Sequence, residues 1–264
     1  MVAAITSGRL RFDAKRVTRR ALQALRRNQV SFAILIFALV GAPRFFLSLL
    51  ETYARSSNPD GASMETLDAS FLVLAFALVA IFMAATAQAA VIDAAVNHRR
   101  NRVRALLADN LRHTKAMVGL SILLVLAIGL GLILFVVPGL VLGVLWVATA
   151  PAIVVEGRSV FASFSRSLRL TRGSRLAIFL LFLVCAPVLV VFLFGLLFVA
   201  VFLQVLIHGP NAIHGQSALD HAAIVTLGSM FVMLVGTLLA ASIYSELRLI
   251  EGDGASAIPT GAPD

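Results

Sequence analysis

Residues 138–175 read PGLVLGVLWVATAPAIVVEGRSVFASFSRSLRLTRGSR. This stretch begins with an apolar run of the kind that crosses a membrane and passes an isolated acid at Glu156. It ends in a segment with an arginine at every third residue, at Arg166, Arg169 and Arg172. Charged side chains are costly inside a bilayer, so we expect the apolar run to be embedded and the charges to lie at a membrane edge. The rest of the chain repeats this pattern.

The composition places the chain among membrane proteins. Of its 264 residues, 60% are hydrophobic and only 13% are charged, whereas soluble domains are about half apolar and a quarter charged. The formal net charge is +9. Because the basic residues flank apolar runs, we expect anionic lipid headgroups rather than nucleic acid as the partner. The single cysteine, Cys185, lies in an apolar run, which excludes a disulfide framework and a CxxC metal site.

The apolar runs predict an all-α, polytopic membrane protein with six transmembrane helices. The predicted spans cover, approximately, residues 30–50, 69–91, 116–137, 140–155, 176–207 and 221–244. Pro43 and Arg44 are expected to interrupt the first span, and Pro138-Gly139 to form the tight turn between the third and the fourth. The run 176–207 is longer than one crossing needs, so either Pro187 kinks it or its end projects from the bilayer.

Three regions follow from these spans. Residues 1–28 are expected to form a basic amphipathic helix in the cytoplasm, and residues 29–250 the six-span membrane domain. Residues 251–264 are rich in Gly, Pro and Ala and are expected to be a disordered cytoplasmic tail. In the segment that connects the fourth span to the fifth, Gly157 suits a helix C-terminus and Ser159 suits the N-cap of the next helix.

Three basic amphipathic helices are predicted on the cytoplasmic side, over Gly8–Asn28, over His98–Lys115 and after Ser159. Each has an apolar stripe with arginines elsewhere, which suits a helix lying in the headgroup layer. Each precedes an odd-numbered span, so the chain resembles three units of interfacial helix plus hairpin. Two interpretations stay open for their arginines, binding of phosphate headgroups or a signal for topology alone. The arginines in question are Arg19, Arg20, Arg26, Arg27, Arg99, Arg100, Arg104, Arg112, Arg166, Arg169, Arg172 and Arg175.

The distribution of basic residues orients the predicted spans. With the N-terminus inside, every Lys and Arg except Arg44 and Arg55 lies on the cytoplasmic side. This arrangement satisfies the positive-inside rule. We therefore expect a multi-pass protein of the bacterial cytoplasmic (inner) membrane with both termini in the cytoplasm.

Several short motifs carry a resemblance to a known family. They are Pro138-Gly139, Ala150-Pro151, Val154-Val155-Glu156-Gly157, Arg166-Ser167-x-x-Leu170-Thr171-x-Gly173, Pro43 in the first span, and Tyr244-x-x-Leu247-Arg248 after the sixth. This pattern resembles the bacterial six-span glycerophosphoryl diester phosphodiesterase membrane domain and related membrane proteins of unknown function. Some members carry a fused phosphodiesterase domain. We expect none here, because the residues after Glu251 are too few, so the resemblance implies no such activity.

Four polar residues are candidates for a site within or beside the spans. Glu156 is either a partner for a ligand or for an arginine across the cytoplasmic mouth, or an interfacial carboxylate paired with Arg158 or a basic helix. Arg44 either forms a buried ion pair, with Asp68 as the candidate acid, or extends to the headgroups. Gln88 is expected to hydrogen-bond between helices. Asp93 lies near the inner edge and is expected to be close to Arg99 and Arg100.

No catalytic motif, metal site or cofactor is predicted. His208, His214 and His221 surround one loop, but their spacing lacks the pattern of zinc sites, and nothing resembles GxSxG or HExxH. The sequence thus favours a non-enzymatic structural or accessory membrane protein that engages anionic lipid or a membrane partner. The alternative is a small-solute transporter or channel subunit. A protein partner or a homo-oligomer stays open.

Overall fold

All regular structure in the described part of the chain is helical. The computed structural model describes residues 12–56, 64–97, 103–134, 136–209 and 218–256. The helices are α1 (Ala14–Ile36), α2 (Ala42–Ser56), α3 (Met64–Val96), α4 (Val103–Leu134), α5 (Val136–Trp146), α6 (Thr149–Glu156), α7 (Val160–Leu170), α8 (Arg175–His208) and α9 (Ala218–Ser256), with a π-helical turn, η1 (Phe37–Gly41), between α1 and α2. The predicted all-α class is confirmed.

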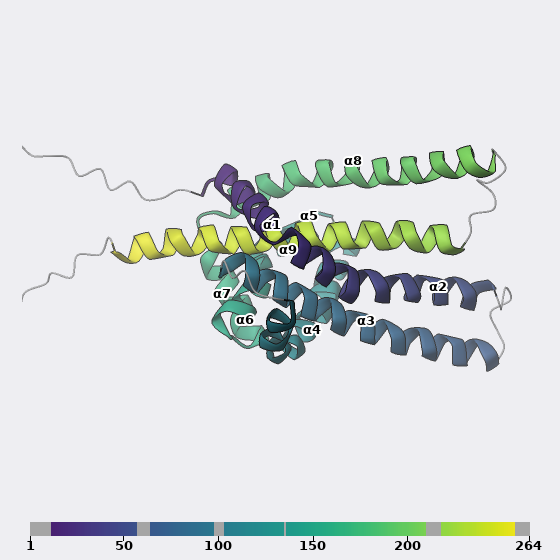
Figure 1. The fold of residues 1–264 in the computed structure, drawn as a ribbon. Coiled ribbons are helices and arrows are strands. Elements are labelled where there is room, and N and C mark those ends of the chain that lie inside the picture. Colours follow the sequence, from purple (N-terminus) through teal and green to yellow (C-terminus); the bar gives the residue numbers. More distant parts are fainter. Residues whose placement is uncertain (1–11, 57–63, 98–102, 135, 210–217, 257–264) are drawn as a thin grey trace, which may run out of the picture.

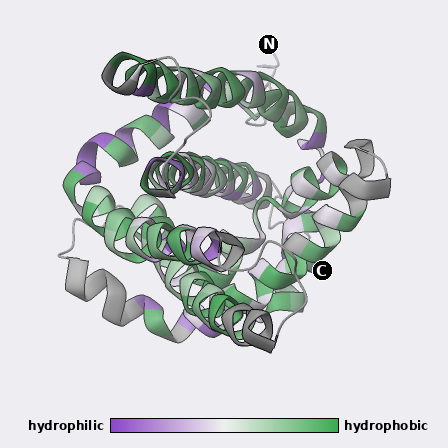
Figure 2. Ribbon diagram, turned by 90° about the vertical axis from the view of Figure 1, so that its right-hand side faces the viewer, coloured by the Kyte–Doolittle hydropathy of each residue, from purple (hydrophilic) through white to green (hydrophobic). Residues whose placement is uncertain are grey.

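Four helical stretches are long and apolar enough to cross a membrane. They are Ala14–Tyr53, Phe71–Val96, Arg175–Leu206 and Leu219–Gly252. Figure 2 shows hydrophobic residues dominating the long helices. An apolar helix needs about 20 residues to cross the hydrocarbon core, which each of these stretches exceeds. These four stretches indicate that the chain is a membrane protein.

The stretch Ala14–Tyr53 contains a basic segment and then an apolar one, which follow each other as consecutive helical segments. The side chain of Asp13 caps α1 by accepting from the Lys15 backbone N–H at 2.9 Å. The helix bends at Asn28, whose φ and ψ are −123° and 21°, and then runs on through η1 into α2. The predicted boundary of the basic helix at residue 28 coincides with this bend, and the chain continues past it as a helix. The residues before Ala14 that belong to this prediction lie outside the described ranges, apart from Phe12 and Asp13.

Pro43 does not end the first apolar helix, in contrast to our expectation of an interruption. A proline lacks the N–H that would bond to a carbonyl one turn earlier. The turn before it widens to the π form, in which the N–H of Ala42 bonds to the carbonyl of Phe37. Such wide turns let a helix absorb a local irregularity and continue.

α9 lies at the centre of the assembly and packs against α1, α2, α3, α6, α7 and α8. Figure 1 shows it running the length of the molecule between α8 and α3. Alanines on α3 allow close contact with α1 and α9, because small side chains let helix backbones approach. The buried set includes Ala87, Ala90 and Ala94. Ala84, one turn earlier, packs against the same cluster.

The predicted turn at Pro138-Gly139 is wrong. α5 begins at Val136 and contains both residues. A proline is tolerated in the first turn of a helix because the N–H groups there have no carbonyl partner within the helix. The predicted fourth span is also divided, since α5 ends at Trp146 and α6 begins at Thr149.

The break between α5 and α6 is closed by a side chain from α7. The Ser167 hydroxyl donates to the carbonyl of Leu145 at 2.7 Å and accepts from the N–H of Ala148 at 3.2 Å. Helix ends leave such backbone groups without partners, and burying them unpaired is costly. One hydroxyl therefore satisfies both sides of the break and fixes α7 against it.

The other predicted boundaries divide into confirmed and corrected ones. α6 ends at Gly157, with φ of 64°, and Ser159 is the N-cap residue of α7, both as predicted. α8 is one helix through Pro187. α9 extends to Ser256, so the expected disorder from Glu251 onward is wrong for its first six residues. Residues 257–264 lie outside the described part.

Candidate functional site

Most of the charged side chains gather at one end of the molecule. Figure 1 shows that the start of α1, the start of α8, the end of α9 and all of α7 lie together there. This end carries two ion-pair networks and a cavity lined by arginines. Each is built from residues on different helices, so the fold rather than a local motif brings them together.

The first network surrounds Glu156 at the end of α6. One of its carboxylate oxygens accepts from the Tyr244 hydroxyl of α9 at 2.7 Å, and Nε of Arg166 donates to both oxygens at 3.0 and 3.2 Å. Nε of Arg158 donates to the second oxygen. The left-handed Gly157 ends α6 at this point and turns the chain, so that Arg158 faces back toward the carboxylate.

Arg166 continues the network to α9. Its two terminal nitrogens each donate to one carboxylate oxygen of Glu251, both at 2.6 Å. Paired parallel contacts of this kind are among the strong hydrogen bonds of proteins. The network thus ties α6, α7 and α9 together.

The electrostatics of the network favour its ionised form. Burial raises the pKa of the Glu156 carboxyl, but the hydrogen bonds from Tyr244, Arg158 and Arg166 outweigh burial and lower the pKa below its usual value. The hydrogen bond to Glu251, with the contribution of Glu156, raises the pKa of Arg166 despite partial burial. Both groups are therefore charged at neutral pH.

The interpretation of Glu156 as an interfacial carboxylate fits this geometry best. It pairs with Arg158 and with a basic helix, as that interpretation states. It also meets an arginine of another helix, as the alternative states. Its two oxygens already accept from three donors of the chain itself. Glu156 therefore joins helices, and its acceptors are occupied.

The second network holds α1 against α9 and was not predicted. Glu246 is only 1% exposed, and its two oxygens lie 3.0 Å from Nε of Arg16 and 2.8 Å from a terminal nitrogen of Arg20. A buried carboxylate needs such partners because water no longer solvates it. The signal available in the sequence was one acid within the apolar run around Tyr244 and Leu247.

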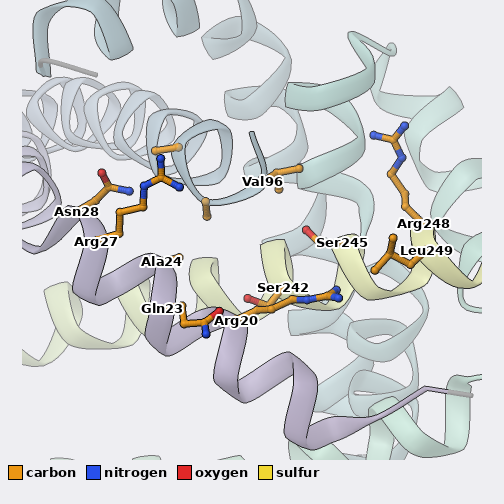
Figure 3. A pocket seen from close by; sticks show the side chains of 12 residues that line it. Arg20, Gln23, Ala24, Arg27, Asn28, Val96, Ser242, Ser245, Arg248 and Leu249 are labelled. Atoms are coloured by element: carbon orange, nitrogen blue, oxygen red, sulfur yellow. The ribbon is translucent and has the colours of Figure 1, made fainter. Parts of the chain in front are cut away.

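A cavity of about 560 Å³ lies between α1, the end of α3 and α9. Figure 3 shows its lining side chains coming from α1 on one side and from α9 on the other, with Val96 at the end of α3. Arg20, Arg27 and Arg248 line it, and none of the other described lining residues is a carboxylate. Asn28 also lines it, at the bend of α1.

The remaining predicted basic residues fall into three groups. Arg175 donates to the carbonyl of Leu168 at 3.2 Å. The side chains of four others lie outside what the structure describes, namely Arg99, Arg100, Arg104 and Arg112. Four more are exposed at the charged end, namely Arg19, Arg26, Arg169 and Arg172.

The other candidate polar residues do not join the charged end's networks. Arg44 lies 3.7 Å from Glu51 on its own helix, while the side chain of the proposed partner Asp68 is not described. Asp93 is buried and accepts from the side-chain amides of Asn97 at 2.5 Å and Asn110 at 3.4 Å. Its expected neighbours Arg99 and Arg100 lie outside the described residues. Gln88 is partly buried.

Comparison with known proteins gives a family and no activity. No curated protein and no solved structure matches the sequence. Residues 12–247 match a protein family described as Domain of unknown function (DUF7847). The matched region begins just before α1 and ends within α9, so it contains both networks except Glu251, and the cavity except its rim at Arg248 and Leu249. The chain therefore belongs to the DUF7847 family.

Proposed function

We propose that this protein is a non-enzymatic, multi-pass protein of the bacterial cytoplasmic membrane that engages anionic lipid headgroups. Its charged end would face the cytoplasm, with six spans behind it and basic amphipathic segments in the headgroup layer. The four long apolar stretches would supply four spans, and α4 with the α5–α6 pair would supply the other two. The resemblance to the glycerophosphoryl diester phosphodiesterase membrane domain belongs to this proposal.

The observation that carries the proposal is that two helices of the charged end pass directly from arginines to exposed apolar surface. On α1 the exposed cations end at Arg27, and Val30 is 72% exposed. On α8, Arg175 is followed directly by Leu176, which is 73% exposed. Water disfavours large exposed apolar surfaces, whereas a bilayer accepts them beside a layer of phosphates.

The exposed arginines have the reach and the charge for headgroups. Arg26 is exposed on α1, Arg169 is exposed on α7, and Arg172 is exposed in the turn that follows α7. Each arginine close to an anionic membrane surface contributes about 1 kcal/mol of attraction. Several together would enrich anionic lipid around the protein without a shaped site.

The test compares lipid selectivity after reconstitution into phosphatidylcholine vesicles. Spin-labelled phosphatidylglycerol and spin-labelled phosphatidylcholine report which lipid is immobilised beside the protein. We expect a clear preference for phosphatidylglycerol that weakens with added salt, because salt screens exposed charges. The triple variant R26Q/R169Q/R172Q should lose much of this preference.

The matched control is R26K/R169K/R172K, which keeps the charge and should keep the preference. An equal affinity of the unmodified protein for both lipids would contradict the proposal. So would a triple glutamine variant that retains the full preference, because the exposed cations would then have no part in it.

A further inference from the structure

The cavity between α1, α3 and α9 has features that general attraction to headgroups does not require. We propose that it is a binding site for a single phosphate group, carried by a phospholipid headgroup or free in solution. In its lipid form, this inference deepens the proposed function and rests on it. The argument uses the charge of the lining, its neutral donors and its position.

The lining has a surplus of positive charge. Three arginines border the cavity, and the other described residues of its lining include no carboxylate. Glu246 offsets Arg20 from outside the lining, at 2.8 Å. Within the described part of the chain, Arg27 and Arg248 lie in no ion pair with a carboxylate, and the guanidinium of Arg248 lies 5.8 Å from the centre of the Tyr244 ring. Two arginines at opposite sides of the cavity are therefore left without an acid among the described residues (Figure 3).

The cavity also offers a neutral donor without an acceptor. The side-chain amide nitrogen of Asn28 is buried and has no hydrogen-bond partner in the structure, and the residue is only 6% exposed. Buried polar groups are nearly always paired, so an exception of this kind points to a missing partner. The Ser242 and Ser245 hydroxyls lie on the α9 side of the same cavity. Figure 3 shows Arg27 and Asn28 side by side on α1, with both serines on α9.

A phosphate fits this set of groups better than a carboxylate does. Guanidinium groups match phosphate oxygens in pairs, and a phosphate offers more oxygens for donors that approach from different helices. The volume of about 560 Å³ leaves room for the rest of a headgroup. Ala24, Val96 and Leu249 provide apolar wall for it.

The position of the cavity suits a headgroup at the membrane edge. Arg27 and Asn28 come less than one helical turn before Val30, which is 72% exposed. A phosphate held by these two residues would lie at the depth at which phospholipid phosphates lie. The proposed site thus needs no displacement of the lipid from its layer.

The experiment measures binding to the full chain in detergent by native mass spectrometry. The probes are phosphatidylglycerol, inorganic phosphate, and acetate as the carboxylate control. We expect one phosphate-bearing ligand per chain, with no retention of acetate. The cavity variant R27Q/R248Q should bind at least tenfold more weakly, while the matched control K15Q/K115Q, with the same change of charge at exposed positions outside the cavity, should change less than twofold.

A second variant, Asn28→Asp, keeps the shape of the side chain and replaces its donor with a negative charge. It should bind as weakly as R27Q/R248Q, and circular dichroism confirms that each variant is folded. Retention of phosphatidylglycerol without inorganic phosphate identifies the lipid form, and retention of inorganic phosphate identifies the free form. Equal loss in cavity and control variants, or retention of acetate, would overturn the site.

The two proposals fail in different ways. If reconstituted protein prefers phosphatidylglycerol but the cavity variants bind it as the unmodified chain does, the site is wrong and the proposed function stands. If no preference exists in vesicles but inorganic phosphate still binds in a manner that depends on Arg27 and Asn28, the proposed function is wrong and the site stands in its free-phosphate form.

Discussion

The guanidinium of Arg166 spans two carboxylates. Its terminal nitrogens contact both oxygens of Glu251 at 2.6 Å, 85 residues farther along the chain, while its Nε contacts Glu156. The position of α7 relative to α6 and α9 depends on this one side chain. The sequence left headgroup binding and a topology signal open for Arg166, and its inward contacts add a structural role.

Replacing Glu156 with glutamine should weaken the junction of α6, α7 and α9. The variant removes the charge that Arg158 and Arg166 share, although Arg166 keeps its pair with Glu251, and we expect the free energy of unfolding to fall by about 2 kcal/mol. The chain has one tryptophan, and Trp146 packs edge-on against Phe164 of α7 at 4.8 Å between ring centres. Its fluorescence during thermal unfolding in detergent measures the change. An unfolding temperature equal to that of the unmodified protein would contradict this role.

The stabilisation by Glu156 should depend on pH in one direction. Its pKa is lower in the folded protein than the ordinary value of 4.5, so the folded state favours the ionised form. The stabilisation is complete above pH 4.5 and is lost as the pH falls through the lowered folded value. The gap in unfolding temperature between the unmodified protein and Glu156→Gln should therefore be constant from pH 7 to 5 and narrow below that. A gap in unfolding temperature that widens on acidification would contradict this prediction, because it would mean that folding raises the pKa of Glu156.

Removing the Ser167 hydroxyl should destabilise the break between α5 and α6. Ser167→Ala leaves the carbonyl of Leu145 and the N–H of Ala148 without their partner, at a cost of about 1–3 kcal/mol. Ser165→Ala is the matched control, because its exposed hydroxyl reaches only the carbonyl of Phe161 at 3.5 Å. Unfolding followed by Trp146 fluorescence should separate the two variants. Equal stabilities would mean that water replaces the hydroxyl.

Two glycine substitutions should have opposite effects. Gly157 has φ of 64°, which disfavours a side chain, so Gly157→Ala should cost about 1 kcal/mol. Gly143 lies inside α5 with nothing within 4 Å of an added methyl group, so Gly143→Ala should stabilise by about 0.5–1 kcal/mol through helix propensity. Chemical unfolding in detergent measures both. The same sign for both variants would contradict the described backbone.

Replacing Glu246 with glutamine should release α1 from α9. Arg16 and Arg20 would then face a neutral group in a buried position, at a cost of about 3 kcal/mol. Hydrogen exchange should report a loss of protection over residues 14–27. Glu251→Gln is the comparison, since it affects α7 and should leave the protection of α1 unchanged. Loss of protection in both variants would indicate general unfolding rather than release of one helix.

Sequence reasoning was most successful where the signal was local. Apolar runs identified the long helices, because length and hydropathy alone decide whether a helix can cross a bilayer. The left-handed Gly157 and the N-cap position of Ser159 were also predicted, since each follows from the preferences of a single residue. Pro138-Gly139 misled the same reasoning, because a proline fits a turn and the first turn of a helix equally well.

The contents of the charged end could not be predicted in the same way. Glu246, Glu251 and Asn28 each look ordinary in sequence, and their partners are distant along the chain or on another helix. The sequence shows the arginines as basic segments, but their division into paired and exposed members depends on which way each helix turns. Packing decides that division, and periodicity alone did not reveal it.

The acids of α9 divide the arginines of its neighbours into two kinds. Tyr244 and Glu251 share one face of α9, and Glu246 lies on nearly the opposite face, since each residue advances about 100° around a helix. One face therefore fixes the inward cation of α7, and the other fixes those of α1. The arginines that point outward are available to solvent or to lipid headgroups. In related chains, we expect outward arginines to vary in number without consequence for the fold, whereas the inward ones and their acids change only together.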